Sequence, residues 1–209
     1  MEHHHDPSHQ PYNTRTLSFE DLEERLLMHG DSITMSKVLD AYEMARSVHA
    51  QQVRNDGTPF FDHSARTVLI LMDELGAYDT DLIIAAFLHD VLEDSKTITK
   101  GIIDYNFGSY VAYVVEMLTK DLTQARIDPD GVDLAHVARL ATASADCVIV
   151  KLAARLDNIR CLSFNVKRNP LVYITNTLER YVPIAEASGN QRLYALATAI
   201  RSEANTFLG

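Results

Sequence analysis

The segment 82–88, LIIAAFL, is the feature that most restricts the fold of this chain. It is apolar on every side of a helix, and such a helix is stable in water only where other elements cover it. Helical periodicity continues on both sides of it from Ser18 onward, and strand-like alternation does not exceed chance. We therefore predict an all-α fold, a helical bundle of about nine or ten helices in which this segment is buried.

Capping and turn residues place the other helices. Ser18 with Asp21 resembles a capping box that opens a helix ending near Gly30. The turn sequence DGTP at 56–59 ends the next helix, and Thr80 can cap the helix that contains the apolar segment. Further helices are predicted at about 61–75, 99–105, 107–119, 132–144, 146–164, 170–187 and 190–207, with a loop at 121–132.

Length and composition fit one soluble domain. We predict that residues 1–15 form a disordered polar tail and that residues 16–209 form a single domain. The net charge of −10 argues against a general nucleic-acid binder. Apolar runs stay below the roughly 18 residues of a membrane span, so we expect no membrane partner and a cytoplasmic protein. The apolar stripe of the last helix, 193–208, either closes the bundle or pairs protomers as a homo-oligomer.

The end of the apolar helix carries the first candidate site, in the sequence AAFLHDVLEDS at 85–95. On a continuous helix, His89, Asp90, Glu93 and Asp94 would fall within roughly 140° of arc on one face. Carboxylates crowded at the end of an apolar helix repel each other unless a cation joins them. An imidazole with carboxylates suits a divalent metal. The alternative is a solvated acidic helix end.

Two further segments accompany this one. The first, HAQQVRNDGTPFFDH at 49–63, leads through an arginine and a glycine turn to His63, which alone would be a capping or core histidine. The second, KLAARLDNIR at 151–160, carries Lys151, Arg155 and Asn158. Basic and amide side chains near an acidic metal cluster would suit phosphate recognition, whereas alone they would be a solvated basic face.

Together these motifs resemble the hydrolase domain of RelA/SpoT-type proteins and the stand-alone Mesh-type small alarmone hydrolases. Between the segments 85–95 and 151–160, the resemblance continues at Phe107-Gly108, Val111-Ala112 and Thr119-Lys120. After residue 160 it continues at 181–185 (YVPIA). Ordered spacing over roughly residues 35–187 makes chance similarity a poor explanation. The resemblance implies an HD-domain helical fold, a Mn²⁺ ion, and removal of pyrophosphate from the 3′ position of (p)ppGpp to give GDP or GTP.

The resemblance also implies roles for individual residues. His63, His89 and Asp90 would bind the metal, and Glu93 and Asp94 would orient and deprotonate the attacking water. The residues implied in nucleotide binding are Arg54, Asn55, Lys151, Arg155, Asn158 and Cys161.

One position departs from the family pattern in a way that bears on activity. The fourth metal ligand of the family is an aspartate, and Ala154 stands in its place. Three explanations compete. The alanine is an engineered change, or it is natural and the metal is held by three protein ligands with water or Asp157 in the fourth place. In the third explanation the protein is a regulator that binds nucleotide without turnover. Asn55 and Cys161 replace residues that are often lysine and threonine, so an HD phosphohydrolase for another nucleotide remains an alternative.

Overall fold

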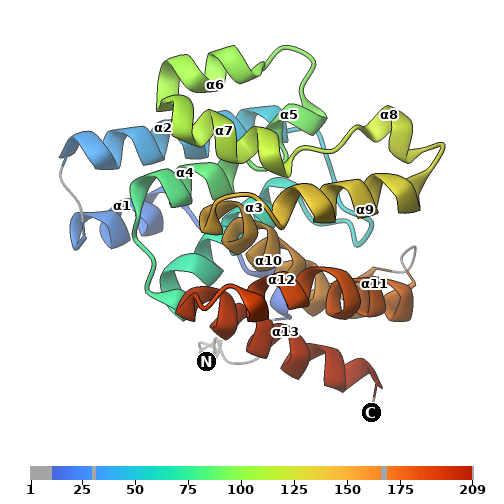
Figure 1. Ribbon diagram of the computed structural model, residues 1–209. Helices are drawn as coiled ribbons and strands as arrows, with labels where there is room; N and C mark the ends of the chain where they lie inside the picture. The colour runs from blue at the N-terminus through green and yellow to red at the C-terminus, as the bar shows by residue number, and fades with distance from the viewer. Residues whose placement is uncertain (1–10, 30–31, 166–168, 209) are drawn as a thin grey trace, which may run out of the picture.

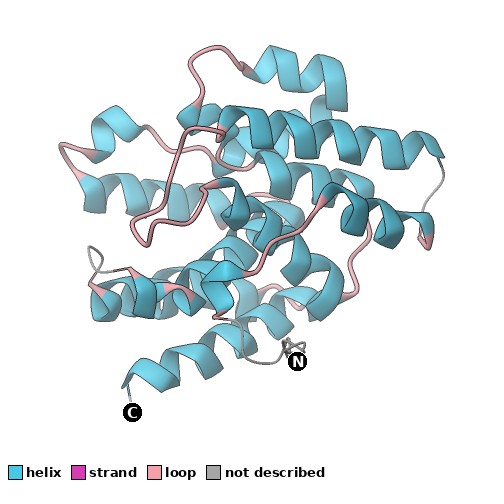
Figure 2. Ribbon diagram, turned by 180° about the vertical axis from the view of Figure 1, so that it is seen from behind, coloured by secondary structure: helices cyan, strands magenta, loops and turns pink. Residues whose placement is uncertain are grey.

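The computed structural model describes residues 11–29, 32–165 and 169–208, and it shows a protein built from helices (Figure 1). Within this part of the chain no strand occurs, and one isolated bridge pairs Val53 with Pro59 (Figure 2). The predicted all-α class is therefore confirmed. Among the same residues, no helix combines the length and apolar character that crossing a membrane requires.

The helical segments follow one another along the whole described chain. In chain order they are η2 (Tyr12–Thr14), α1 (Phe19–Leu27), α2 (Ser32–Val48), α3 (Phe61–Leu69), η3 (Ile70–Glu74), α4 (Thr80–Leu88), α5 (Val91–Asp94), α6 (Lys100–Phe107), α7 (Ser109–Leu118), α8 (Leu122–Ala125), α9 (Pro129–Leu140), α10 (Ala145–Arg160), η4 (Leu162–Phe164), α11 (Pro170–Asn176), η5 (Thr177–Tyr181), α12 (Val182–Ala187) and α13 (Gln191–Leu208).

Helix α4 lies in the centre of the bundle. Its residues from Leu82 to Leu88 are at most 1% exposed. Helices α2, α3, α7 and α10 all pack against it, which explains why none of its faces carries a polar residue between these two leucines. Burial of this helix, predicted from its sequence, is confirmed.

The three elements that carry the candidate motifs meet in this core. Helices α3, α4 and α10 contact one another pairwise, and His63 on α3 reaches Asp157 near the C-terminal end of α10. On the opposite side of α10, helix α13 packs with Leu193, Leu196 and Ile200 buried. The apolar stripe of the last helix therefore covers α10 within the chain.

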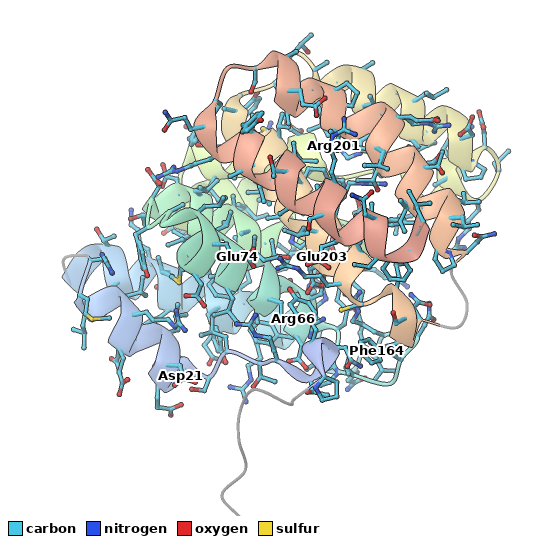
Figure 3. All side chains as sticks on the ribbon, turned by 90° about the horizontal axis from the view of Figure 1, so that it is seen from below. Asp21, Arg66, Glu74, Phe164, Arg201 and Glu203 are labelled. Carbon is cyan, nitrogen blue, oxygen red and sulfur yellow. The ribbon has the colours of Figure 1, made fainter. Side chains whose placement is uncertain are left out.

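An ion-pair bridge fixes the C-terminal helix to the rest of the bundle. Arg160 at the end of α10 donates to Glu74 of η3 and, at 2.8 Å, to Glu203 of α13. Figure 3 labels both glutamates, which lie near each other between their helices. One arginine thus joins three elements that are far apart in the sequence.

Local capping agrees with the sequence at α1. The side chain of Ser18 accepts a hydrogen bond from the backbone N–H of Asp21 at 3.0 Å, as the capping box predicts.

Gly108 separates α6 from α7 with a φ of 95°, a left-handed value that glycine adopts without steric cost.

The predicted loop at 121–132 is wrong. Residues Leu122–Ala125 form α8, and α9 begins at Pro129. Asp121 caps the first of these helices by accepting from the N–H groups of Thr123 and Gln124, and Asp128 caps the second by accepting from Gly131. Aspartate before the first turn and proline within it start helices as well as turns, so the same residue types favoured the wrong structure here.

The predicted continuous helix through the HDxxED sequence is also wrong. Helix α4 ends at Leu88, and α5 begins at Val91 after a turn at residues 89–90. Asp90 has φ −103° and ψ −3°, and its carbonyl accepts from the N–H groups of Glu93 and Asp94. Asp90 therefore lies in the turn, and Glu93 and Asp94 lie on the separate helix α5, so the three carboxylates do not share one helix face.

The predicted N-terminal tail extends too far along the chain. Residues 1–10 lie outside the described residues. Tyr12–Thr14 form a helical turn, and Asn13 is 7% exposed. The backbone carbonyls of Asn13 and Arg15 accept hydrogen bonds from Arg66 at 2.9 and 3.3 Å. The chain from residue 11 onward is thus attached to the bundle.

Candidate metal centre

A tight turn leads into the helix that carries His63. The backbone N–H of Arg54 donates to the carbonyl of Thr58 at 2.8 Å, and Gly57 within the turn has a φ of 85°. Asp56 stabilises the turn by accepting from both the N–H and the hydroxyl of Thr58. The DGTP sequence therefore returns the chain so that Arg54 and His63 lie on the same side of α10.

His63, His89 and Asp90 bring three potential ligand atoms together. One such atom from each residue lies within 4.8 Å of the others. Oδ2 of Asp90 is 3.2 Å from Nε2 of His89 and 3.8 Å from Nε2 of His63. Ligand atoms that share a cation at about 2.1 Å stand roughly 3 Å apart when they are at right angles. The spacing therefore fits one divalent cation between them.

Both histidine rings are oriented by hydrogen bonds on their other nitrogen. Nδ1 of His89 donates to the carbonyl of Ala86 at 2.8 Å, and Nδ1 of His63 lies 2.6 Å from Oδ2 of Asp157. With Nδ1 of each ring used in this way, Nε2 of both rings faces Asp90 and is the atom that a cation would contact. This donor set fits a divalent metal such as manganese, zinc or iron, because two neutral imidazoles and one carboxylate are their usual protein ligands.

Burial keeps His63 neutral. It lowers the pKa of His63 to about 4, even though the hydrogen bond to Asp157 acts in the opposite direction. Burial would also raise the pKa of Asp157, but the hydrogen bond and charge of His63, together with Arg66, lower it to about 2. At neutral pH Asp157 is therefore an ionised acceptor, and His63 is a neutral donor at Nδ1.

Glu93 and Asp94 lie beside this cluster on α5. Oε1 of Glu93 accepts from the backbone N–H of Lys120 at 2.6 Å, and Oδ2 of Asp94 lies 3.6 Å from Nδ1 of His49. Burial, followed by the neighbouring charge of Asp90, raises the pKa of both carboxyl groups. A carboxylate with a raised pKa is a better proton acceptor near neutral pH.

Lys151 puts positive charge next to Glu93 and Asp90, and Lys120 lies close to Lys151. Lys151 on α10 has its pKa lowered to about 8 by burial and by Lys120, while Asp90 and Glu93 act in the opposite direction. Lys120 donates to Asp133 at 2.7 Å and lies 3.3 Å from the hydroxyl of Tyr181. The Lys151 ammonium therefore offsets the acidic charge of Asp90 and Glu93, whereas the Lys120 ammonium is paired with Asp133.

A cavity of about 220 Å³ opens directly beside His63 and Asp90. Arg54 crosses it and donates from Nη2 to Oδ1 of Asn158 at 2.7 Å. At its rim, Nδ2 of Asn55 donates to Oδ1 of Asn165 at 3.3 Å. The residues that line the cavity are Val53, Arg54, Asn55, Phe60, His63, Asp90, Asn158 and Asn165.

Of the residues expected to bind nucleotide, Lys151, Arg155 and Cys161 are not among those that line the cavity, and the last two are buried. Arg155 is 6% exposed, donates to the hydroxyl of Thr177, and places its guanidinium over the rings of Tyr173 and Tyr181. Cys161 is 2% exposed, and burial raises its pKa to about 11. Neither residue lines the cavity, because α10 turns their side chains toward other helices. Ala154, at the position of the absent aspartate, is 4% exposed.

Sequence reasoning missed the contacts of Arg66. Its Nε donates to Oδ1 of Asp157 at 2.6 Å, and the two side chains are 1% and 0% exposed. The available signal was a charged residue followed by apolar residues on α3 (Arg66 before 68–72) and one preceded by them on α10 (Asp157 after Leu156). Such residues are rarely buried without a partner of opposite charge.

The comparisons place this chain in a known family. The HD domain family matches residues 41–190, and the chain belongs to this family. A guanosine-3′,5′-bis(diphosphate) 3′-pyrophosphohydrolase of Aquifex aeolicus is 36% identical over 174 residues, which are 83% of this chain and 24% of the relative. A GTP pyrophosphokinase rsh of Brucella suis is 32% identical over 174 residues, or 82% of this chain and 23% of the relative. The chain thus spans about a quarter of the length of these curated relatives.

A solved structure shares the fold over most of its length. It belongs to a metazoan ortholog of SpoT, described as hydrolysing ppGpp and playing a role in starvation responses. It superposes with a TM-score of 0.66 at 25% identity and covers 80% of this chain and 95% of that protein. The HD-domain fold and the resemblance to RelA/SpoT-type and Mesh-type hydrolases are confirmed.

Proposed function

We propose that this protein hydrolyses the 3′-pyrophosphate of (p)ppGpp-like nucleotides with the help of a divalent cation, which we expect to be Mn²⁺. The observation that carries the proposal is the convergence of His63, His89 and Asp90 within 4.8 Å, next to a cavity lined by Arg54 and Asn158. Relatives whose names include this activity, or the related synthesis, support the choice of substrate.

In this proposal His63, His89 and Asp90 would hold the cation, which when bound would supply positive charge against the phosphates and make the attacking water more acidic. Glu93 accepts the proton of that water, for which its raised pKa suits it, and Asp94 beside it orients the water. The water oxygen forms a bond to the phosphorus attached to the ribose 3′ oxygen, and the bond from that phosphorus to the 3′ oxygen breaks. The products are pyrophosphate and GDP or GTP.

The remaining residues of the site bind and orient the nucleotide. Arg54 and Asn158 project into the cavity and suit the base or ribose, since both offer hydrogen-bond donors there. Lys151 lies near Asp90 and Glu93 and supplies a positive charge for the phosphates. We do not assign a nucleotide contact to Arg155 or Cys161, because other helices bury both of them.

The test is the release of pyrophosphate from ppGpp in the presence of Mn²⁺. We expect turnover by the chain as it stands and its loss in Glu93→Gln, which keeps the shape of the side chain but cannot accept a proton. Absence of turnover together with tight ppGpp binding would replace the hydrolase by a nucleotide-binding regulator, the alternative that Ala154 raises. Absence of both would point to an HD phosphohydrolase for another nucleotide.

A further inference from the structure

Asp157 is a fully buried carboxylate with an unusual number of positive or proton-donating neighbours. Its side chain is 0% exposed. Oδ2 lies 2.6 Å from Nδ1 of His63, and Oδ1 accepts from Nε of Arg66 at 2.6 Å. Nη1 of Arg54 lies 3.8 Å from Oδ2. Taking a carboxylate out of water is costly, so partners on both oxygens are needed to stabilise it there.

The ring of His63 stands between Asp157 and the candidate metal position. Nδ1 faces Asp157 at 2.6 Å, whereas Nε2 faces Oδ2 of Asp90 at 3.8 Å. Asp157 therefore touches the nitrogen that is turned away from Asp90 and His89. A carboxylate in this place acts on a metal through the histidine, because accepting the Nδ1 proton fixes the tautomer and makes Nε2 more basic.

We propose that Asp157 is a positioning residue that acts through His63: it holds the Nδ1 proton and so keeps the Nε2 lone pair directed toward the metal. The inference rests on the proposed function, since it takes His63 as a metal ligand. It also bears on Ala154, which stands where the family has a fourth metal ligand. With only three ligand side chains, the site depends more strongly on the orientation and basicity of each imidazole.

Asp157 is itself positioned by Arg66, and Arg66 is bound to the N-terminal segment. Two of the Arg66 nitrogens donate to Asp157, while Nη1 donates to the backbone carbonyls of Asn13 and Arg15. Figure 3 shows Arg66 between the bundle and the first described residues. The chain of contacts thus runs from the N-terminal segment through Arg66 and Asp157 to His63.

The variant Asp157→Asn makes the proposal testable without removing the side chain. Arg66 can only donate, so it selects the amide oxygen as its acceptor. The amide NH₂ group is then left to face Nδ1 of His63 and donates to it. The proton of the imidazole moves to Nε2, and the lone pair needed by the metal is lost. The change keeps the size of the side chain but reverses the tautomer.

The experiment reads the tautomer of His63 in the metal-free protein by ¹⁵N NMR of the ring nitrogens, with the signal assigned from His63→Gln. We expect the Nδ1–H form in the wild-type chain and the Nε2–H form in Asp157→Asn. A wild-type chain in the Nε2–H form would overturn the inference, even if the variant fails to fold. Asp133→Asn is the matched control, because Asp133 accepts from Lys120 and Tyr181 rather than from His63.

Binding of Mn²⁺, followed by calorimetry, gives the second readout. We expect Asp157→Asn to weaken Mn²⁺ affinity by about 10- to 100-fold, the usual effect of losing such a carboxylate, and Asp133→Asn to leave it within a few-fold. Equal affinity in wild type and Asp157→Asn would overturn the inference. Failure of the wild-type chain to bind Mn²⁺ would instead contradict the proposed function, whatever the tautomer of His63.

Discussion

Nη2 of Arg54 donates a hydrogen bond of 2.7 Å to Oδ1 of Asn158, across 104 positions of the sequence. This bond joins the turn before α3 to the last turns of α10, and both side chains line the cavity beside His63. The guanidinium is thereby held across the cavity before any ligand binds. Such preorganisation lowers the entropy lost when a nucleotide is bound.

Loss of this hydrogen bond should therefore affect binding more than chemistry. We expect Asn158→Ala to raise KM for ppGpp by about tenfold while kcat changes little, because a contact equal in the ground and transition states affects KM alone. Steady-state kinetics measure both constants. The control is Asn106→Ala on α6, which loses only a hydrogen bond to Ile102 and should leave KM unchanged. A fall in kcat at constant KM would contradict this role.

Restoring a carboxylate at Ala154 tests how the three-ligand site compares with a four-ligand one. We expect Ala154→Asp to tighten Mn²⁺ binding by about tenfold or more, because a further anionic oxygen adds to the coordination of a hard cation. Calorimetric titration with Mn²⁺ measures the change. Ala154→Asn serves as the control for side-chain size, since its neutral oxygen is a weaker ligand. Equal affinity in all three proteins would mean that position 154 does not face the metal.

Much of this site could be predicted from the sequence, because its parts are local. The apolar segment before His89 required a buried helix, and the DGTP turn required the chain to reverse before His63. These two features place imidazoles and carboxylates near the core without any knowledge of the packing. The break between α4 and α5 was not predictable in this way, since HDxxED is compatible with a continuous helix.

The contacts of α10 depended on the packing of several helices. Its periodicity could not decide which polar residue of this helix faces the cavity. Asn158 lines the cavity, whereas Arg155 and Asp157 are buried against other elements. Arg155 is held by two tyrosines of the segment 173–181, and Asp157 by residues of α3. Partners this distant in the sequence leave no spacing pattern that a single chain can reveal.

Lys151 should tune the acidity of Glu93. Burial and Asp90 raise the pKa of Glu93, while the positive charge of Lys151 lowers it. In Lys151→Met this opposing charge is absent, so the pKa of Glu93 rises further. We expect the acid limb of the kcat/KM profile to move to higher pH, because a larger fraction of the general base is then protonated at a given pH. An acid limb that stays in place, or moves to lower pH, would exclude this coupling.

His136 should make the stability of the fold dependent on pH. It is 2% exposed, and its Nε2 donates to the carbonyl of Met117 at 3.2 Å. Burial, followed by the charges of Lys151, Lys120 and Arg139, lowers its pKa to about 2. In the unfolded chain a histidine titrates near about 6.5. Between these two values the unfolded state binds a proton that the folded state does not.

The contribution of His136 to stability is therefore complete above the unfolded pKa and is lost as the pH falls below it. For one such group the free energy of unfolding changes by about 1.4 kcal/mol per pH unit. In His136→Gln the amide can still donate to Met117 but does not titrate. We expect urea unfolding between pH 4.5 and 6 to show a shallower pH dependence in this variant, by roughly that slope. His63 also titrates from a lowered pKa, but it does so in both proteins and cancels from the difference. Parallel pH dependences would show that His136 is already protonated in the folded chain.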